Sequence, residues 1–408
     1  MNIRLNLPKP IAPVEIKITG SKSETNRLLL LQALYPEISL TNISESDDSA
    51  VMQHALLGND SSIDVHHAGT AMRFLTAYFA IQQDREVILT GSARMKERPI
   101  SILVAALQSL GAQIEYLEKE GYPPLKIKGR KITKDKVTLK ADVSSQYITA
   151  LLLIAPKLEN GLEVILEGEI TSRPYIMMTL SLLNENGATA IFANNTIKVI
   201  PLERVTPKNV TVESDWSSAS YFYAIIALSE PGTRITLSSY KEDSLQGDSV
   251  LAEIYENLGV NTEYNDDSII LQRTAFKPEP LNLNLINSPD IAQTMAVTCF
   301  GLGIACTLTG LHTLKIKETD RLEALKKELK KLGAEISVTN DSLYLSAEKT
   351  IANTVQRIDT YNDHRMAMAF APLAVRIPLI INNAEVVSKS YPEFWNDMKT
   401  LGFSVSEL

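Results

Sequence analysis

Basic and hydroxyl-bearing residues gather in one stretch near the start of the chain, GSKSETNR at residues 20–27, which runs directly into four leucines. Ser21 followed by Glu24 three residues later is typical of a capping box and predicts that a helix begins here. Lys22 and Arg27 then lie in or just after the first turn, at the positive end of the helix dipole. Because two cations are unfavourable there without an anion, the stretch indicates either an anion-binding helix start or a capped helix with solvated basic side chains.

The same arrangement recurs along the chain, each time where hydroxyls, amides, carboxylates or cations precede an apolar segment of helical period. The seven further stretches are residues 68–73 (AGTAMR), 144–146 (SSQ), 172–174 (SRP), 215–218 (DWSS), 288–290 (SPD), 317–321 (KETDR) and 362–365 (NDHR). One such start would be ordinary. Eight, of which five carry Arg or Lys, predict helix N-termini that converge on a polyanionic ligand.

The composition is that of an ordinary folded protein. The 408 residues suffice for two or three domains, and 45% apolar with 22% charged residues is typical of globular chains. A net charge of −8 argues against general nucleic-acid or membrane-surface binding, although local cations can still bind a small anion. No apolar leader and no run of about 18 apolar residues is visible, so we expect a cytoplasmic protein. An organelle protein whose transit peptide has been removed is the alternative.

Neither metal ligands nor a reactive thiol stand out in the sequence. The five histidines show none of the spacings that typically bind metals. Cys299 and Cys306 lie in an apolar stretch and are expected to be buried, inert thiols.

An internal repeat organises the chain. Five segments share an amphipathic helix, a glycine and then a strand–turn–strand: residues 103–128, 177–200, 251–271, 325–345 and 394–408, with glycines at 111, 187, 259, 333 and 402. Each glycine follows a stripe of apolar residues at helical period, which predicts a left-handed residue that ends the helix. A sixth copy near Gly58 is shortened, because residues 49–66 are too few for a helix, a hairpin and a return strand.

The repeats and the polar helix starts between them predict an α/β protein of six β-α-β-α-β-β units. Three units in each of two lobes is the natural division. We expect one lobe at residues 20–213 and the other at residues 1–19 and 214–408, because residues 17–20 and 205–213 read as the two crossing segments.

Seven stretches, taken together and in order, resemble the 5-enolpyruvylshikimate-3-phosphate (EPSP) synthase family, the 3-phosphoshikimate 1-carboxyvinyltransferases. They are residues 20–27, 68–73, 94–99 (RMKERP), 143–146 (VSSQ), 215–219 (DWSSA), 317–321 and 361–368 (YNDHRMAM). The resemblance extends from Lys22 to about Trp395. It implies the two-lobed enolpyruvyl transferase fold, an inside-out α/β barrel with helix N-termini directed into the cleft, which agrees with the repeats.

The resemblance also implies a reaction. Shikimate 3-phosphate and phosphoenolpyruvate would give 5-enolpyruvylshikimate 3-phosphate and phosphate, in aromatic amino-acid biosynthesis. Two phosphates and two carboxylates must be bound, which calls for Arg, Lys and N–H donors, and the proton transfers call for carboxylates. The expected partners are these two small molecules, with no cofactor, metal, nucleic acid or membrane, and the protein is expected to be a monomer.

Carried over position by position, the resemblance assigns three sets of residues. The catalytic set is Lys22, Asp290, which accepts the 5-hydroxyl proton, and Glu318, which delivers a proton to the methylene. The set for shikimate 3-phosphate, mostly in the first lobe, is Lys22, Ser23, Arg27, Ser144, Ser145, Gln146, Ser172, Asp290 and Lys317. The set for phosphoenolpyruvate is Lys22, Gly69, Arg94, Gln146, Arg321, Arg365 and Lys389. The first lobe is thus expected to be the shikimate-phosphate side, and the second lobe the side of phosphoenolpyruvate and of the acid–base residues.

Several positions depart from the family pattern. His67 stands where Asn is usual, Phe74 replaces a common Pro, and Trp216 replaces a small residue. The family is the target of glyphosate, which occupies the phosphoenolpyruvate site, where Gly69 leaves room for it. Because His67 and Phe74 flank that position, we expect intermediate sensitivity to glyphosate.

Two alternatives remain at this level. An enolpyruvyl transferase acting on UDP-N-acetylglucosamine has the same fold but typically uses a loop cysteine as its acid, and neither Cys299 nor Cys306 lies in a polar loop. A non-catalytic binder of phosphorylated metabolites would be expected to have lost acid and base groups, whereas Asp290 and Glu318 are present.

Overall fold

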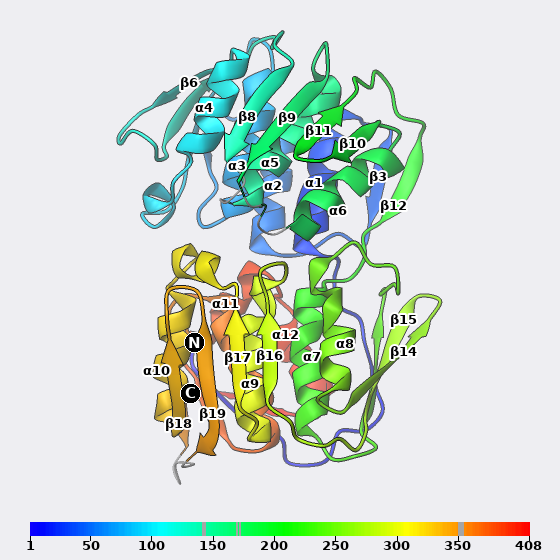
Figure 1. The fold of residues 1–408 in the computed structure, drawn as a ribbon, viewed down its shortest axis with the longest axis vertical. Helices are drawn as coiled ribbons and strands as arrows, with labels where there is room; N and C mark the ends of the chain where they lie inside the picture. The colour runs from blue at the N-terminus through cyan, green and yellow to red at the C-terminus, as the bar shows by residue number, and fades with distance from the viewer. Residues whose placement is uncertain (141–143, 169, 171–172, 350–354) are drawn as a thin grey trace. The chain divides into compact units, whose positions relative to one another are not determined.

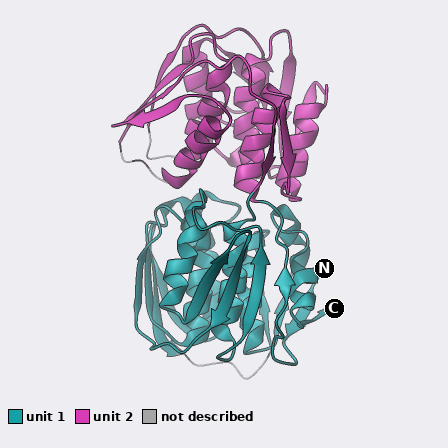
Figure 2. Cartoon of the chain, turned by 90° about the vertical axis from the view of Figure 1, so that its right-hand side faces the viewer, with its two compact units in different colours: residues 1–20, 213–408 teal, residues 21–212 magenta. Residues whose placement is uncertain are grey.

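The chain forms two compact units, which are coloured separately in Figure 2. The computed structural model describes residues 1–140, 144–168, 170, 173–349 and 355–408. Unit 1 comprises Met1–Gly20 and Glu213–Leu408, and unit 2 comprises Ser21–Val212. Gly20 and Glu213, which we expected in the other lobe, therefore belong to unit 1, where Gly20 forms a β-bridge with Ser214. The assignment of one substrate to each unit stays a prediction.

Unit 2 is a continuous stretch of chain (Figure 1). Its helices are α1 (Lys22–Leu34), α2 (Asp47–Leu57), α3 (Gly69–Ile81), α4 (Ser101–Leu110), α5 (Ser145–Ile154) and α6 (Arg173–Glu185), with 3-10 turns η1 (Met95–Glu97) and η2 (Ala155–Lys157). Its strands are β3 (Ile38–Thr41), β4 (Ser62–Asp64), β5 (Glu86–Thr90), β6 (Gln113–Tyr116), β7 (Leu125–Lys128), β8 (Lys136–Lys140), β9 (Leu162–Glu167), β10 (Ala190–Ala193), β11 (Thr196–Val199) and β12 (Lys208–Thr211). They form sheets of order β4-β5-β7-β6, β10-β11-β9-β8 and β12-β3.

Unit 1 contains both ends of the chain. Its helices are α7 (Trp216–Leu228), α8 (Leu251–Glu256), α9 (Ala292–Leu302), α10 (Arg321–Lys331), α11 (His364–Phe370) and α12 (Phe394–Thr400). Its 3-10 turns are η3 (Gly247–Val250), η4 (Pro289–Ile291), η5 (His312–Ile316), η6 (Ala371–Val375) and η7 (Ala384–Lys389). Its strands are β1 (Ile3–Asn6), β2 (Glu15–Ile16), β13 (Arg234–Ser238), β14 (Val260–Asn265), β15 (Ser268–Arg273), β16 (Leu281–Asn284), β17 (Cys306–Thr309), β18 (Ala334–Val338), β19 (Leu343–Lys349), β20 (Gln356–Ile358), β21 (Leu379–Ile381) and β22 (Ser404–Glu407). The sheets have the order β14-β15-β13-β2, β16-β17-β19-β18 and β20-β21-β1-β22.

The predicted repeat is confirmed. In the run β16-α9-β17-α10-β18-β19, β16 and β17 pair in parallel across α9, and β18 and β19 form the antiparallel hairpin. The five glycines that follow the repeat helices all have positive φ, from 78° at Gly259 to 113° at Gly111. Among the described residues the strands of each unit form separate sheets, and no continuous hydrogen-bonded barrel is detected.

The shortened first copy is also confirmed. Its sheet has only the two strands β12 and β3, whereas the other five sheets have four. Helix α2 ends at Gly58, whose φ of −79° and ψ of 164° are extended rather than left-handed. The chain therefore continues straight into β4 without making a hairpin.

The last copy differs from the prediction of a strand–turn–strand after Gly402. Among the described residues, only the strand β22 follows that glycine. Its antiparallel partner is β1 from the opposite end of the chain, with Ile3 opposite Glu407 and Asn6 opposite Ser404. The N-terminal strand thus supplies the missing half of the hairpin.

The predicted capping box at Ser21 is wrong, since Ser21 precedes α1 but its side chain makes no capping hydrogen bond. At four of the other predicted helix starts a carboxylate or a hydroxyl caps the helix, whereas Ala68 and Ser288 make no side-chain capping hydrogen bond. Asp215 accepts from the backbone N–H of Ser218 at 2.7 Å, and Asp320 from that of Glu323 at 3.2 Å. Ser144 and Asp363 cap α5 and α11 in the same way.

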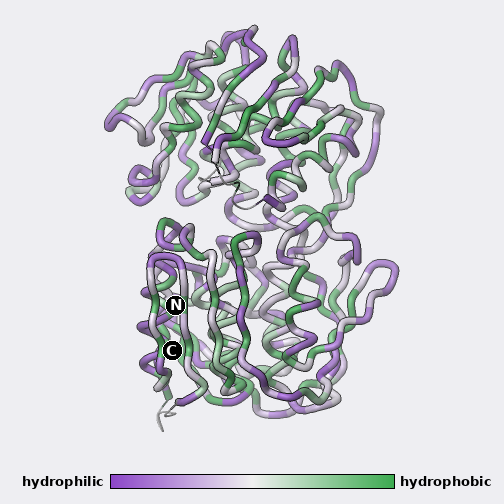
Figure 3. Tube along the Cα trace, viewed as in Figure 1, coloured by the Kyte–Doolittle hydropathy of each residue, from purple (hydrophilic) through white to green (hydrophobic). Residues whose placement is uncertain are grey.

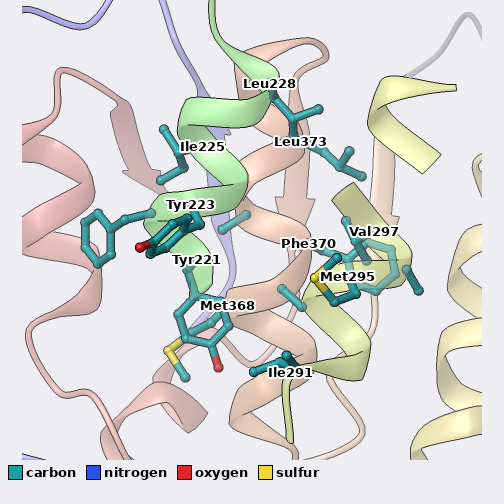
Figure 4. Packing of buried hydrophobic residues seen from close by; sticks show 14 of the residues in the cluster. Tyr221, Tyr223, Ile225, Leu228, Ile291, Met295, Val297, Met368, Phe370 and Leu373 are labelled. Carbon is teal, nitrogen blue, oxygen red and sulfur yellow. The ribbon is translucent and has the colours of Figure 1, made fainter. Parts of the chain in front are cut away.

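Helices lie at the core of unit 1. All seven residues of α11 are buried, as are nearly all of α7 and α9. Figure 4 shows Tyr221, Met295 and Phe370 from these three helices packed together. The outer strands alternate buried and exposed residues, and hairpin tips such as that of β14 and β15 are hydrophilic (Figure 3). Within the described residues, no helix has both the length and the apolar character needed to cross a membrane.

Gly111 allows a test of the left-handed helix ends. Its φ is 113°, and a Cβ placed there would meet no atom within 4 Å. Gly111→Ala should therefore lower the free energy of unfolding by about 1–2 kcal/mol through backbone conformation alone. Urea unfolding measures the change. Gly111→Asn is the control and should cost less, because Asn tolerates this conformation; equal losses for the two variants would contradict the explanation.

Candidate active site

A buried guanidinium in unit 1 holds three carboxylates. Arg321, the first residue of α10, is 1% exposed. Its Nη1 donates to Asp290 Oδ1 at 3.0 Å, its Nη2 to Glu318 Oε2 at 2.9 Å, and its Nε to Asp363 Oδ2 at 2.7 Å. The two predicted acid–base residues are thus joined by one predicted binding residue, and the rigid planar fork fixes the geometry of their carboxylates.

Asp290 is surrounded by cations. Besides Arg321, Lys317 Nζ lies 3.6 Å from its Oδ1 and Arg365 Nη2 lies 3.2 Å from its Oδ2. Burial on its own would raise the pKa of Asp290, but Arg365, Lys317 and Arg321 hold that pKa well below its ordinary value. Asp290 is therefore ionised without a ligand, and its proton affinity depends on how strongly these three cations are engaged.

Lys317 is the third cation at Asp290. Although Asp290 acts to raise it, burial and the neighbouring Arg321 hold the pKa of Lys317 below its ordinary value. A bound anion in contact with Lys317 would favour its charged form.

Arg365 connects Asp290 to a further carboxyl. Its Nη1 donates to the Asp290 backbone carbonyl at 3.3 Å and its Nη2 to Ser217 Oγ at 3.4 Å. Ser217 Oγ donates a short hydrogen bond to Asp248 Oδ2. Burial, followed by repulsion from Asp290, raises the pKa of Asp248 to about 7. The sequence analysis did not single out Asp248, whose only signal is a Gly-Asp pair before an apolar helix.

Lys389 lies near the start of α11. Its Nζ donates to the backbone carbonyl of Asn362 at 2.6 Å. Tyr361 and Asn362 both have positive φ, so the chain turns sharply before Asp363 caps the helix. The structure therefore brings Lys389 to the helix that carries Arg365.

In unit 2, Lys22 meets a carboxylate that the sequence analysis missed. Its Nζ lies 3.5 Å from Asp48 Oδ2, and both side chains are mostly buried. Asp48 is in the first turn of α2, in the shortened copy of the repeat. Asn26 strengthens the same junction, because its Oδ1 accepts from Ser49 Oγ at 3.0 Å. The pair of adjacent aspartates at the start of the helix was the available signal.

Arg27 is directed into the interior of unit 2. It is 3% exposed, its Nε donates to Thr179 at 2.9 Å and its Nη1 to the Ser23 carbonyl at 2.6 Å. Its guanidinium lies 5.6 Å from the centroid of the Phe74 ring. Burial lowers the pKa of Arg27 to about 10. Arg27 therefore supports the backbone at Ser23, and its contact with shikimate 3-phosphate stays a prediction.

Gly69 begins α3 and lies against Arg98, which the sequence analysis did not select as a site residue. A Cβ on Gly69 would lie 2.6 Å from Arg98 Nη1 and 2.9 Å from its Cζ. A side chain at this position would therefore displace the Arg98 guanidinium. The arginine of the same helix, Arg73, is buried and donates to the carbonyls of Gly69 and Pro99. Burial, and then repulsion from Arg98, lowers the pKa of Arg73 to about 10.

The starts of α3 and α5 are joined by a predicted site residue. Gln146 Nε2 donates to Thr70 Oγ1 at 3.1 Å, next to Gly69. Ser144 caps α5 and Ser145 is buried at its first position. Ser172 lies outside the described residues.

Arg94 lies in an exposed position before η1. Its Nη1 is paired with Glu97 Oε2 at 2.9 Å, and 46% of its side chain is exposed. Nearby, His67 Nδ1 lies 3.1 Å from Ser92 Oγ. The structure thus places Arg94 at the surface and does not bring it into a buried network like that of Arg321.

The two cysteines lie together in the interior of unit 1. Cys299 and Cys306 are buried in unit 1, and contact with Cys306 together with burial raises the pKa of the Cys299 thiol well above its ordinary value. In the part of the chain that the structure describes, no three His, Cys, Asp or Glu side chains are grouped as metal ligands.

Comparison with solved structures identifies the class of fold. An EPSP synthase from Acinetobacter baumannii matches with a TM-score of 0.78 over 100% of both chains, at 21% identity. An enolpyruvyl transferase from Streptomyces tendae matches with a TM-score of 0.74 over 99% of this chain and 98% of that one, at 13% identity. The chain therefore has the two-lobed enolpyruvyl transferase fold.

Comparison of sequences identifies the family. The family model of EPSP synthase (3-phosphoshikimate 1-carboxyvinyltransferase) matches residues 55–398. A protein named 3-phosphoshikimate 1-carboxyvinyltransferase from Bacteroides fragilis is 48% identical over 401 residues, which cover 97% of each chain. Another of the same name from Vibrio campbellii is 37% identical, over 95% of this chain and 96% of that protein. The chain belongs to the EPSP synthase family, as its motifs predicted.

The role of the Arg321 fork can be tested by a conservative change. Arg321→Lys keeps one positive charge but cannot hold three carboxylates, so Asp290 and Glu318 should lose their fixed positions. We expect kcat/KM to fall by about 10² or more, measured by steady-state kinetics on folded protein. Arg376→Lys is the matched control. Arg376 is half-exposed, and its ion pair with the exposed Glu230 is long at 3.9 Å. Unchanged kinetics in Arg321→Lys would show that the fork is not required.

Proposed function

We propose that this protein transfers the enolpyruvyl group of phosphoenolpyruvate to the 5-hydroxyl of shikimate 3-phosphate and releases phosphate, a step of aromatic amino-acid biosynthesis. The observation that carries the proposal is the pairing of Asp290 and Glu318 on one buried guanidinium. Such a reaction needs one carboxylate to accept a proton and another to deliver one. Membership of the family supports the same activity.

The cations around Asp290 suggest how its basicity is controlled. Without substrates, three cations hold its pKa low, so Asp290 is a weak base. An anionic substrate bound to Arg365 or Lys317 would share their charge, and the pKa of Asp290 would rise. Asp290 would then accept the 5-hydroxyl proton while Glu318 delivers a proton to the methylene carbon of phosphoenolpyruvate. The base is thus activated by binding of the substrates.

The remaining assignments follow the family pattern. We assign shikimate 3-phosphate to Lys22, Ser23, Arg27, Ser144, Ser145, Gln146, Ser172, Asp290 and Lys317. We assign phosphoenolpyruvate to Lys22, Gly69, Arg94, Gln146, Arg321, Arg365 and Lys389. The contact of Lys389 with the turn before α11, and that of Gln146 beside Gly69, support two of these assignments. A monomeric state and a cytoplasmic location stay predictions from the sequence.

Phosphate release tests the function and the acid together. The native chain should release phosphate only when both phosphoenolpyruvate and shikimate 3-phosphate are present. Glu318→Gln should lower kcat by about 10²–10⁴, the usual effect of removing a general acid, because an amide is not acidic enough to donate a proton to the methylene carbon. Binding of shikimate 3-phosphate, measured by calorimetry, should change little.

Three outcomes would count against these assignments. Release with UDP-N-acetylglucosamine in place of shikimate 3-phosphate would favour the other enolpyruvyl transferase, and binding without turnover would favour a metabolite binder. An unchanged kcat in Glu318→Gln would remove Glu318 from the mechanism. Glu323→Gln is the matched control, since Glu323 lies in the first turn of α10, which follows Glu318, and pairs with Lys326.

Glyphosate sensitivity tests the departures near Gly69. The Phe74 ring is fully buried and faces Arg27, while His67 contacts Ser92. Because a tightly packed helix start cannot relax freely, both residues should weaken glyphosate binding more than phosphoenolpyruvate binding. The ratio of the glyphosate inhibition constant to the phosphoenolpyruvate KM should therefore fall in the His67→Asn, Phe74→Pro double variant. An identical ratio in the native chain and the double variant would show that these residues do not set sensitivity.

A further inference from the structure

Asp248 is a buried carboxyl that the proposed chemistry does not use. It lies in η3 and is 3% exposed. Its Oδ2 accepts from Ser217 Oγ, while its Oδ1 is buried and accepts no hydrogen bond from the described residues. Ser217 Oγ is also 3.4 Å from Arg365 Nη2, so one hydroxyl lies between Asp248 and the guanidinium assigned to phosphoenolpyruvate.

We propose that Asp248 is a positioning residue that acts through Ser217 and sets, by gaining or losing a proton, how strongly Arg365 binds the anionic groups of phosphoenolpyruvate. The inference rests on the proposed assignment of Arg365 to this substrate. It adds a proton-dependent control of affinity to a site whose catalytic residues are Asp290 and Glu318.

The charged groups around Asp248 come from several elements. Asp290 in η4 and Asp215 at the start of α7 repel its carboxylate, whereas Arg365 in α11 attracts it. The glutamates of the following helix α8, Glu253 and Glu256, are exposed. Burial is the largest effect, so the pKa of Asp248 rises to about 7, and the carboxyl changes charge close to neutral pH.

The two protonation states have opposite consequences for Arg365. When Asp248 is ionised, Ser217 Oγ donates a hydrogen bond to the carboxylate, and the negative charge of Asp248 partly neutralises Arg365. When Asp248 is protonated, that charge is absent and Arg365 attracts an external anion more strongly. Because the pKa is raised, the high-affinity state is present at low pH and is lost as the pH rises through about 7.

The segment that carries Asp248 is held firmly against α7. Gln246 Oε1 accepts from the Trp216 backbone N–H at 2.9 Å, and its Nε2 donates to the Ser214 carbonyl at 2.8 Å. Buried Glu213 accepts from Trp216 Nε1 at 2.8 Å and from Ser244 Oγ at 2.6 Å. Trp216, one of the departures from the family pattern, thus helps to fix the distance between Asp248 and Ser217.

The test is the pH dependence of the phosphoenolpyruvate KM at saturating shikimate 3-phosphate, in the native chain and in Asp248→Asn. The amide imitates the protonated carboxyl, so the two KM values should agree near pH ~6. Near pH ~8.5 the native KM should exceed that of Asp248→Asn by about fivefold, a common size for coupling between two sites. Ionisation of the substrates affects both proteins equally and therefore cancels in the ratio of their KM values. The kcat values of the two proteins should differ much less than their KM values.

Two further variants separate this role from a structural one. Ser217→Ala removes the intervening hydroxyl and should flatten the pH dependence of the KM ratio, even if it weakens binding at every pH. Asp397→Asn is the matched control: burial also raises the pKa of Asp397, but this carboxyl accepts from Tyr391 and should leave the native pH dependence intact.

The possible failures can be told apart. Absence of turnover in the native chain would overturn the proposed function. Normal turnover with a KM ratio that stays constant from pH ~6 to pH ~8.5 would overturn the role of Asp248 and leave the function standing.

Discussion

The ion-pair network of Arg321 is the interaction on which the chemistry of unit 1 depends. One guanidinium, almost removed from solvent, binds carboxylates from η4, from the turn before α10 and from the start of α11. Removing charges from water is costly unless they are paired and hydrogen-bonded, so each member of the network requires the others. The carboxylates of Asp290 and Glu318 are therefore fixed before any substrate arrives.

The repeat explains why these groups meet. The start of α10, the turn η4 before α9 and the starts of α7 and α11 meet through hydrogen bonds of Arg321 and Arg365. Polar residues gather at these starts, whereas the bodies of α9 and α11 are buried. Asp363 has two functions in this arrangement, since it caps α11 through the Arg365 N–H and pairs with Arg321. The same residue thereby stabilises a helix and orients the site.

Local signals made the architecture predictable. Glycine at the end of an apolar helical stripe fixes a left-handed residue, so five repeat helices could be located from the sequence, and the lack of length after Gly58 revealed the shortened copy. Long-range pairing was not predictable in this way. Nothing local indicates that β1 completes the last hairpin, that Arg27 turns inward to Thr179, or that Arg98 lies against Gly69.

The pairing of β1 with β22 has a consequence for how the chain folds during synthesis. Unit 2 is one uninterrupted segment, so all of its described strands are available once Val212 has been made. Unit 1 instead combines Met1–Gly20 with Glu213–Leu408, and in its sheet β20-β21-β1-β22 the neighbours of β1 follow unit 2 in the chain. β1 therefore has no partner strand until β21 and β22 have been synthesised, after the whole of unit 2. Its short length of four residues limits the edge that it presents to other chains during that interval.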